Sequence, residues 1–310
     1  MSINRNKTEF WKSDVETSVD FYNRWFLEFA PSTYRHAREL TAKRVRKAFK
    51  DLSDGMSITA SALDRVPETL MILRQMTCPT LARERLSGLA KVSKSVVEHF
   101  ENGKRESKRC KWEPLLAIIR KLLDADLMPW LLKGVKPKSI ERQRAVLVVA
   151  DRLCGALSDP IIRNAQEKRQ FASITAFLKD KGYRFVLPNA YSEMKPGDFA
   201  FHLNIPVKHS DGGEANVNVT VDVAILPKTA KSGDLPILIE AKSAGDFTNV
   251  NKRRKEEAQK MAQLKRTYGE VSYILFLCGY FDSGYLGYEA AEGLDWIWEH
   301  RISDMEALGL

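Results

Sequence analysis

PILIEAKSAGDFTNVNKRRKEE, residues 236–257, joins a short apolar run to two charged residues, a polar loop and a basic run. Residues 237–242 have the length and apolar character of a buried strand. Because side chains alternate across a strand, Glu240 and Lys242 lie on the same face. A charged side chain inside an apolar strand is costly unless it is paired or bound to a metal ion. The stretch therefore predicts a strand that carries a functional carboxylate and a functional ammonium.

The preceding predicted strand supplies a second carboxylate. In NVNVTVDVAIL, residues 216–226, apolar and polar residues alternate, which places Asp222 on the polar face. If the two strands pair in a suitable register, Asp222, Glu240 and Lys242 converge. Two carboxylates can hold Mg²⁺, which keeps several of its waters and lowers their pKa. Lys242 could then orient such a water or, with a depressed pKa, accept its proton. The alternative is an ion pair on a solvated strand.

The basic segment that follows suits contact with nucleic acid. Lys and Arg bind phosphates, and Asn and Arg also pair with base edges. Positive charge at a helix N-terminus opposes the helix dipole, so helix stability does not explain the segment. The alternative is a solvated helix face. The candidate DNA-binding residues of this segment are Asn249, Asn251, Lys252, Arg253, Arg254 and Lys255.

A helix expected over residues 160–181 carries one more candidate acid. Pro160 after Asp159 is typical of a helix start. Glu167 is a catalytic or metal-ligating candidate if this helix packs beside the active-site strands; otherwise it is the outward partner of Arg163, one turn earlier. Arg163 and Asn164 are further candidates for DNA contact.

The order of the predicted elements indicates an α/β fold. A basic helix over 252–268 between two apolar strands favours a β–α–β crossover and a mixed sheet. The predicted strands span 183–187, 198–205, 216–226, 237–242 and 271–280.

The part of the chain before this sheet is expected to be helical. Ser13 and Pro31 have the character of a helix start and a helix end, and residues 133–139 that of a linker. We therefore expect an N-terminal helical region over 1–135 and a catalytic domain over 140–310.

Residues 81–123 resemble a helix-turn-helix unit of the phage-repressor type. The unit consists of a first helix over 82–89, a turn, and a second helix capped by Ser93. In such units the second helix enters the major groove of DNA, and here Lys94 and Ser95 would lie at base edges. A plain helical hairpin is the alternative.

Charge and composition agree with a soluble protein that binds a polyanion. The net charge is +9, and residues 1–150 hold 29 Lys/Arg against 18 Asp/Glu. No apolar run approaches the roughly 18 residues that cross a membrane. The four cysteines lack metal-ligand spacing, which favours reduced thiols in the bacterial cytoplasm.

Longer stretches resemble the XamI family of type II restriction endonucleases, its SalI-like members in particular. These stretches are 150–170, 235–260 and 275–302, with 21–35 and 77–89 in support. The resemblance implies the PD-(D/E)XK nuclease core, a mixed central β-sheet flanked by helices. It also implies that Asp222 is the first acid, Glu240 the second and Lys242 the lysine. Val221 stands where that motif often has proline.

The resemblance also implies an activity. This activity is Mg²⁺-dependent double-strand cleavage of DNA at a short palindrome, of the GTCGAC type in SalI-like members, leaving 5′-phosphate ends. A palindromic site implies a homodimer, and a cognate DNA methyltransferase would protect host DNA at the same site. Two alternatives stay open: a structure-selective DNA repair nuclease, and a non-catalytic DNA-binding regulator that uses residues 81–123.

Overall fold

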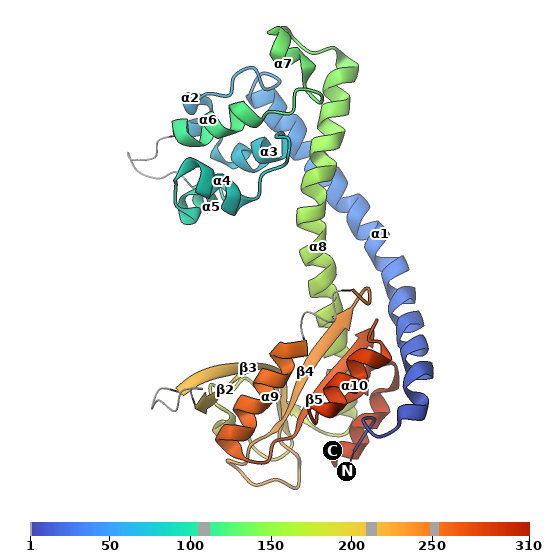
Figure 1. Cartoon of the computed structure of the whole chain (residues 1–310). Coiled ribbons are helices and arrows are strands. Elements are labelled where there is room, and N and C mark those ends of the chain that lie inside the picture. Colours follow the sequence, from blue (N-terminus) through green and yellow to red (C-terminus); the bar gives the residue numbers. More distant parts are fainter. Residues whose placement is uncertain (1, 105–111, 209–215, 249–253) are drawn as a thin grey trace. The chain divides into compact units, whose positions relative to one another are not determined.

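The structure, a computed structural model, describes residues 2–104, 112–208, 216–248 and 254–310 (Figure 1). A six-stranded sheet has its strands in chain order, with β1–β2, β4–β5 and β5–β6 parallel and the other pairs antiparallel. The strands are β1 (Arg184–Phe185), β2 (Asp198–Lys208), β3 (Asn216–Ile225), β4 (Ile237–Ala244), β5 (Tyr273–Gly279) and β6 (Asp295–Trp298). The expected α/β class and the β4–α9–β5 crossover are confirmed, with α9 at Arg254–Tyr268.

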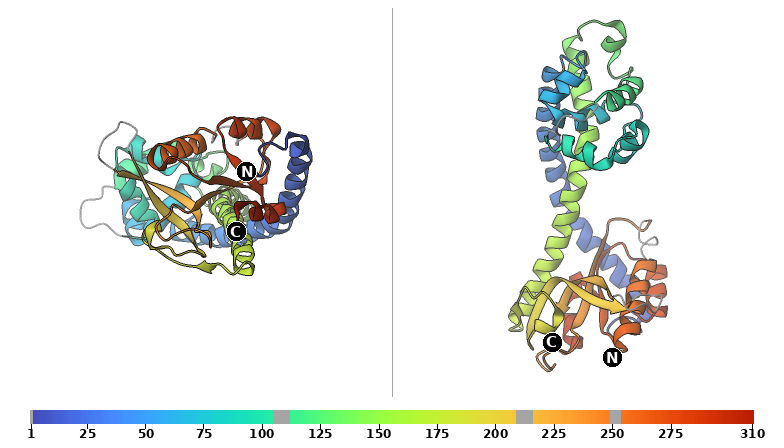
Figure 2. Two further views of the ribbon diagram at one scale, coloured as in Figure 1. Left: turned by 90° about the horizontal axis from the view of Figure 1, so that it is seen from below. Right: turned by 90° about the vertical axis from the view of Figure 1, so that its left-hand side faces the viewer.

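Helices cover both faces of this sheet (Figure 2). The C-terminal half of α8 (Ser139–Asp180) packs on one face through Ile174 and Leu178. On the other face lie α9, through Met261 and Leu264, and α10 (Ser283–Ala291). Strand β6 was not predicted as a strand, and its two tryptophans, Trp296 and Trp298, are fully buried in the core. No helix in the described part of the chain is long and apolar enough to cross a bilayer.

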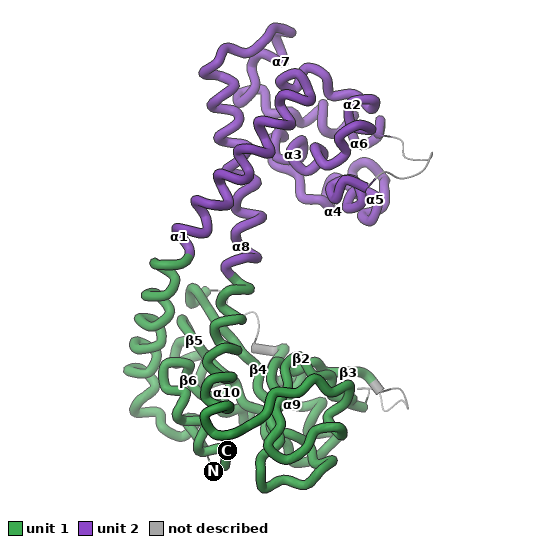
Figure 3. Tube along the Cα trace, turned by 180° about the vertical axis from the view of Figure 1, so that it is seen from behind, with its two compact units in different colours: residues 1–29, 163–310 green, residues 30–162 purple. Residues whose placement is uncertain are grey.

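The chain forms two compact units (Figure 3). Unit 1 consists of residues 1–29 and 163–310 and contains the sheet, and unit 2 consists of residues 30–162. These bounds differ from the predicted division, because residues 133–139 lie within unit 2. There Gly134, with φ of 62°, ends the short helix α7 (Pro129–Lys133) without starting a new unit.

Two long helices, α1 (Trp11–Asp51) and α8, each contribute to both units. Pro31 lies inside α1 and Pro160 lies inside α8, so the helix end and the helix start predicted there are wrong. The predicted start at Ser13 is also wrong, because its hydroxyl bonds the Phe10 carbonyl within an existing helical turn. An internal proline removes one backbone hydrogen bond, and buried residues on both sides of each proline keep these helices continuous.

Unit 2 is helical, as the sequence predicts for most of this region. Helix α4 (Arg83–Ala90) and helix α5 (Lys94–Glu101) are joined by a turn in which Lys91 has φ of 54°, so the two predicted helices and the turn between them are present. Ser93 occupies the N-cap position, but its hydroxyl bonds Ser95 instead of a backbone N–H. The remaining helices are α2 (Ala60–Arg65), α3 (Leu70–Gln75) and α6 (Trp112–Leu122).

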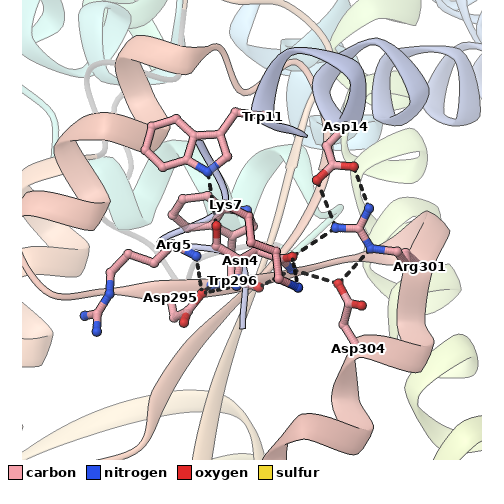
Figure 4. A network of polar contacts seen from close by, with 9 residues as sticks. All are labelled: Asn4, Arg5, Lys7, Trp11, Asp14, Asp295, Trp296, Arg301 and Asp304. Atoms are coloured by element: carbon pink, nitrogen blue, oxygen red, sulfur yellow. Dashed lines mark hydrogen bonds and ion pairs between the residues drawn. The ribbon is translucent and has the colours of Figure 1, made fainter. Parts of the chain in front are cut away.

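In unit 1 a network of hydrogen bonds and ion pairs connects residues 3–14 with residues 295–304 (Figure 4). The buried Asp295 carboxylate accepts hydrogen bonds from the backbone N–H groups of Ile3, Asn4 and Arg5 at 2.6–2.9 Å. The Arg301 guanidinium bonds both oxygens of Asp14 and one oxygen of Asp304. The N-terminal segment is therefore part of the unit that holds the sheet.

We expect Asp295→Asn to lower the free energy of unfolding by roughly 2–4 kcal/mol, because an amide replaces one acceptor oxygen with a donor facing backbone N–H groups. Denaturant unfolding measures this change. The control is Glu306→Gln, which breaks an exposed ion pair with Lys181 at 2.6 Å and should leave unfolding close to wild type. Equal stability of the two variants would contradict the role of Asp295.

Candidate active site

The candidate site lies where β3 and β4 stop pairing. Their last pair is Val223–Ile239, one residue short of Asp222 and Glu240. Beyond this point β3 stays paired with β2 and β4 with β5, so the two strands diverge and the sheet forks. The backbone N–H of Ala241 donates to Asp222 Oδ2 at 2.8 Å. The structure thus brings Asp222 to the side of Glu240 at the fork.

A residue with left-handed backbone on β2 lies opposite Asp222. His202 has φ of 52°, and its pairing with Asp222 is missing from an otherwise continuous register. In β3 the apolar side chains change from one face of the sheet to the other at this point. Val223 packs in the cluster on the α8 side, whereas Val221 packs in the cluster on the α9 side. From its alternation, the sequence predicts that the apolar residues of β3 share one face. This prediction is wrong, because they pack on different faces before and after Asp222. Asp222 sits at the change of face.

Four charged side chains form one alternating network beside Asp222. Lys242 Nζ lies 3.0 Å from Glu240 Oε1 and 2.7 Å from Glu257 Oε1. Lys260 Nζ lies 2.6 Å from the same Glu240 oxygen. The exposed fraction of the side chain is 0% for Glu257, 6% for Glu240, 16% for Lys242 and 29% for Lys260. The order of charges is thus Glu257, Lys242, Glu240, Lys260, in a nearly buried setting.

Sequence reasoning missed the two members of this network that α9 supplies. Glu257 and Lys260 are one helical turn apart, and Glu257 lies on the buried stripe of α9 with Met261 and Leu264. A carboxylate at a core position of an amphipathic helix is unusual. The position of Glu257 on that stripe was the signal in the sequence that could have identified it as a candidate.

The environment shifts the pKa values of two of these groups. Burial, and then the charge of Glu240, raises the pKa of Asp222 above its usual range. Burial acts to lower the pKa of Lys242, but the carboxylates of Glu240 and Glu257 outweigh burial and leave it raised. Lys242 is therefore held as an ammonium.

The arrangement fits a divalent cation. Three carboxylates stand against two ammonium groups here, which leaves one negative charge without compensation. The carboxylates are those of Asp222, Glu240 and Glu257, and the ammonium groups those of Lys242 and Lys260. Glu240 Oε2 is buried and has no hydrogen-bond partner in the described part of the chain. Among the described residues no cluster of three or more His, Cys, Asp or Glu has metal-binding geometry. Mg²⁺ is often held by one or two carboxylates with water completing the shell, so Asp222 and Glu240 suffice.

The other predicted acid lies at the edge of this region. The Glu167 carboxylate is 3.7 Å from Nε2 of His202, and His202 is the residue that lies opposite Asp222 on β2. Arg163 and Asn164 are exposed on α8.

The remaining candidates for DNA contact fall in two places. Asn249, Asn251, Lys252 and Arg253 lie outside the described residues, as do the side chains of Arg254 and Lys255 at the start of α9. In unit 2, Lys94 and Ser95 are exposed on the first turn of α5, and Lys94 pairs with Glu84 at 2.8 Å.

Comparison with known proteins identifies the family. The family model described as XamI restriction endonuclease matches residues 54–298. The chain is 50% identical, over 318 aligned positions and 99% of both chains, to the type II restriction enzyme SalI of Streptomyces albus G. A search of solved structures found no match. The forked sheet with its paired acids agrees with a restriction-endonuclease-like fold. The chain belongs to the XamI restriction endonuclease family and is a type II restriction endonuclease, a site-specific deoxyribonuclease.

Proposed function

We propose that the enzyme makes Mg²⁺-dependent double-strand cuts at a short palindrome of the GTCGAC type and leaves 5′-phosphate ends. The observation that carries this proposal is the pair of acids at the fork, Asp222 and Glu240, beside an ammonium held between two carboxylates. The 50% identity to SalI supports the type of site. A repair nuclease or a non-catalytic regulator is not favoured by any contact described above.

Each residue of the fork has a distinct part in this proposal. Asp222 and Glu240 would hold Mg²⁺, which supplies a nucleophilic water and neutralises charge at the phosphate. Lys242, as an ammonium, donates hydrogen bonds that orient the water for in-line attack on phosphorus. Glu167 is proposed as an additional acid whose carboxylate acts through His202, the residue opposite Asp222.

DNA contact is proposed for both units. Unit 2 holds 26 Lys/Arg against 15 Asp/Glu, so the whole net positive charge of the chain lies in it. Helix α5, with Lys94 and Ser95, is the proposed reading helix. In unit 1 the contacts are proposed for Arg163, Asn164 and the basic segment 249–255. A palindromic site further implies a homodimer acting in the bacterial cytoplasm, and a methyltransferase that protects the same site.

The first test uses unmethylated plasmid with either Mg²⁺ or EDTA, followed by sequencing of the fragment ends. We expect discrete fragments only with Mg²⁺, all sharing one palindromic end sequence with 5′-phosphates. Nicking, smearing or cleavage confined to branched DNA would support the repair nuclease, and an intact plasmid the regulator.

Asp222→Asn should abolish cleavage and yet stabilise the metal-free protein. The change removes a partly buried charge beside Glu240 and keeps an acceptor for the Ala241 N–H. We expect thermal unfolding in EDTA to move up by roughly 2–5 °C, with DNA affinity retained. Wild-type cleavage by this variant would exclude Asp222 from catalysis, and an unchanged or lower midpoint would contradict the electrostatic cost.

Lys94→Ala should weaken binding to the cognate duplex by roughly 5- to 10-fold, because an exposed ammonium on the reading helix is lost. Fluorescence anisotropy with Ca²⁺ in place of Mg²⁺ measures the affinity. Lys121→Ala, at an exposed lysine of α6, is the matched control. Equal affinities of the two variants would remove Lys94 from the interface.

A further inference from the structure

We propose that Glu257 is the positioning residue that holds the Lys242 ammonium at the reacting phosphate, so that α9 contributes a necessary part of the active site. This inference rests on the catalytic part proposed above for Lys242. Glu257 makes no contact with Asp222 among the interactions described above. Its effect is exerted through Lys242.

The contacts distinguish the two partners of Lys242. Glu240 Oε1 lies within 3.0 Å of Lys242 and within 2.6 Å of Lys260, so this oxygen is already shared. Glu240 is also the proposed ligand of the cation, which would compete for the same carboxylate. Glu257 lies 2.7 Å from Lys242 and is fully buried. Glu257 is therefore the partner that stays with Lys242 when Glu240 is engaged elsewhere.

Stability alone does not account for a carboxylate at this position. Glu257 lies on the apolar stripe of α9, and neither of its carboxylate oxygens has a hydrogen-bond partner in the described part of the chain. The ion pair with Lys242 is the contact that compensates its charge. Burying such a group costs free energy, and apolar residues of similar volume are often at least as stable in place of a buried ion pair. A leucine or methionine there would continue the stripe of Met261 and Leu264. The cost is explained if the carboxylate fixes the place of Lys242.

Fixing that ammonium matters because a lysine side chain has four rotatable bonds. Two carboxylates that approach Nζ from different elements, β4 and α9, restrict it to one place. A displacement of about 1 Å in a catalytic group can lower the rate about 100-fold. Loss of Glu257 should therefore affect the chemical step and leave DNA binding intact.

The test is Glu257→Gln, which keeps the shape and removes the charge. The matched control is Glu256→Gln, because Glu256 is the preceding, exposed residue of the same helical turn. The substrate is a duplex carrying the site read from the plasmid ends. We expect Glu257→Gln to lower the single-turnover rate with Mg²⁺ about 100-fold, with an affinity in Ca²⁺ within about twofold of wild type. The control should change neither.

Lys242→Met separates this inference from the proposed function. If Lys242→Met is inactive and Glu257→Gln cleaves within about threefold of the control, the inference about Glu257 is wrong and the proposed function stands. If both variants cleave at the wild-type rate, the catalytic part proposed for Lys242 is wrong, and the inference falls with it.

A thermal double-mutant cycle keeps the inference testable if Glu257→Gln folds poorly. Removing both charges leaves neither unpaired, so Glu257→Gln with Lys242→Met should unfold at a higher temperature than the less stable single variant. Strictly additive losses in midpoint would show that the two residues do not depend on each other and would overturn the inference.

Discussion

The candidate active site depends on one electrostatic constraint: two carboxylates, Asp222 and Glu240, are brought together where water is largely excluded. Like charges this close repel, and the raised pKa of Asp222 reflects that repulsion together with burial. The fold tolerates the pair because the surroundings supply compensation. The Ala241 N–H bonds Asp222, and Lys242 and Lys260 bond Glu240. The unfavourable pair is the feature on which the proposed binding of a divalent cation rests, because a cation would offset the charge of the two carboxylates.

Much of unit 1 could be predicted from the sequence, because its signals are local. The alternation of β3, the apolar run of β5 and the charged helix between β4 and β5 each specify an element and together specify a crossover. The predictions failed where tertiary packing overrides a local signal. Pro31 and Pro160 are strong helix breakers by local rules, yet both lie inside long helices whose flanking residues are buried. The short strand β6 was missed because only its pairing with β5 makes it a strand.

The residues of the candidate site also fall into those that local signals predict and those that depend on tertiary packing. Glu240 and Lys242 lie two residues apart on one strand, so their common face follows from the geometry of a strand, and Asp222 lies on the strand before. The contribution of α9 does not follow from any spacing, because it depends on how that helix packs over the fork. The left-handed backbone at His202 could not be predicted either, because the polar and apolar residues of β3 opposite it alternate without a break through the change of face.

The network around Asp295 and Arg301 has a consequence for the order of synthesis. Residues 30–162 form an insertion between two parts of unit 1, and the first residues of the chain bond side chains close to its last residues. During synthesis the N-terminal segment leaves the ribosome long before its binding partners Asp295 and Arg301. Asp222, Glu240 and Lys242 also follow residues 30–162 in the chain. Unit 1 therefore cannot be completed until residues 295–301 have left the ribosome, after the whole of unit 2 has been made.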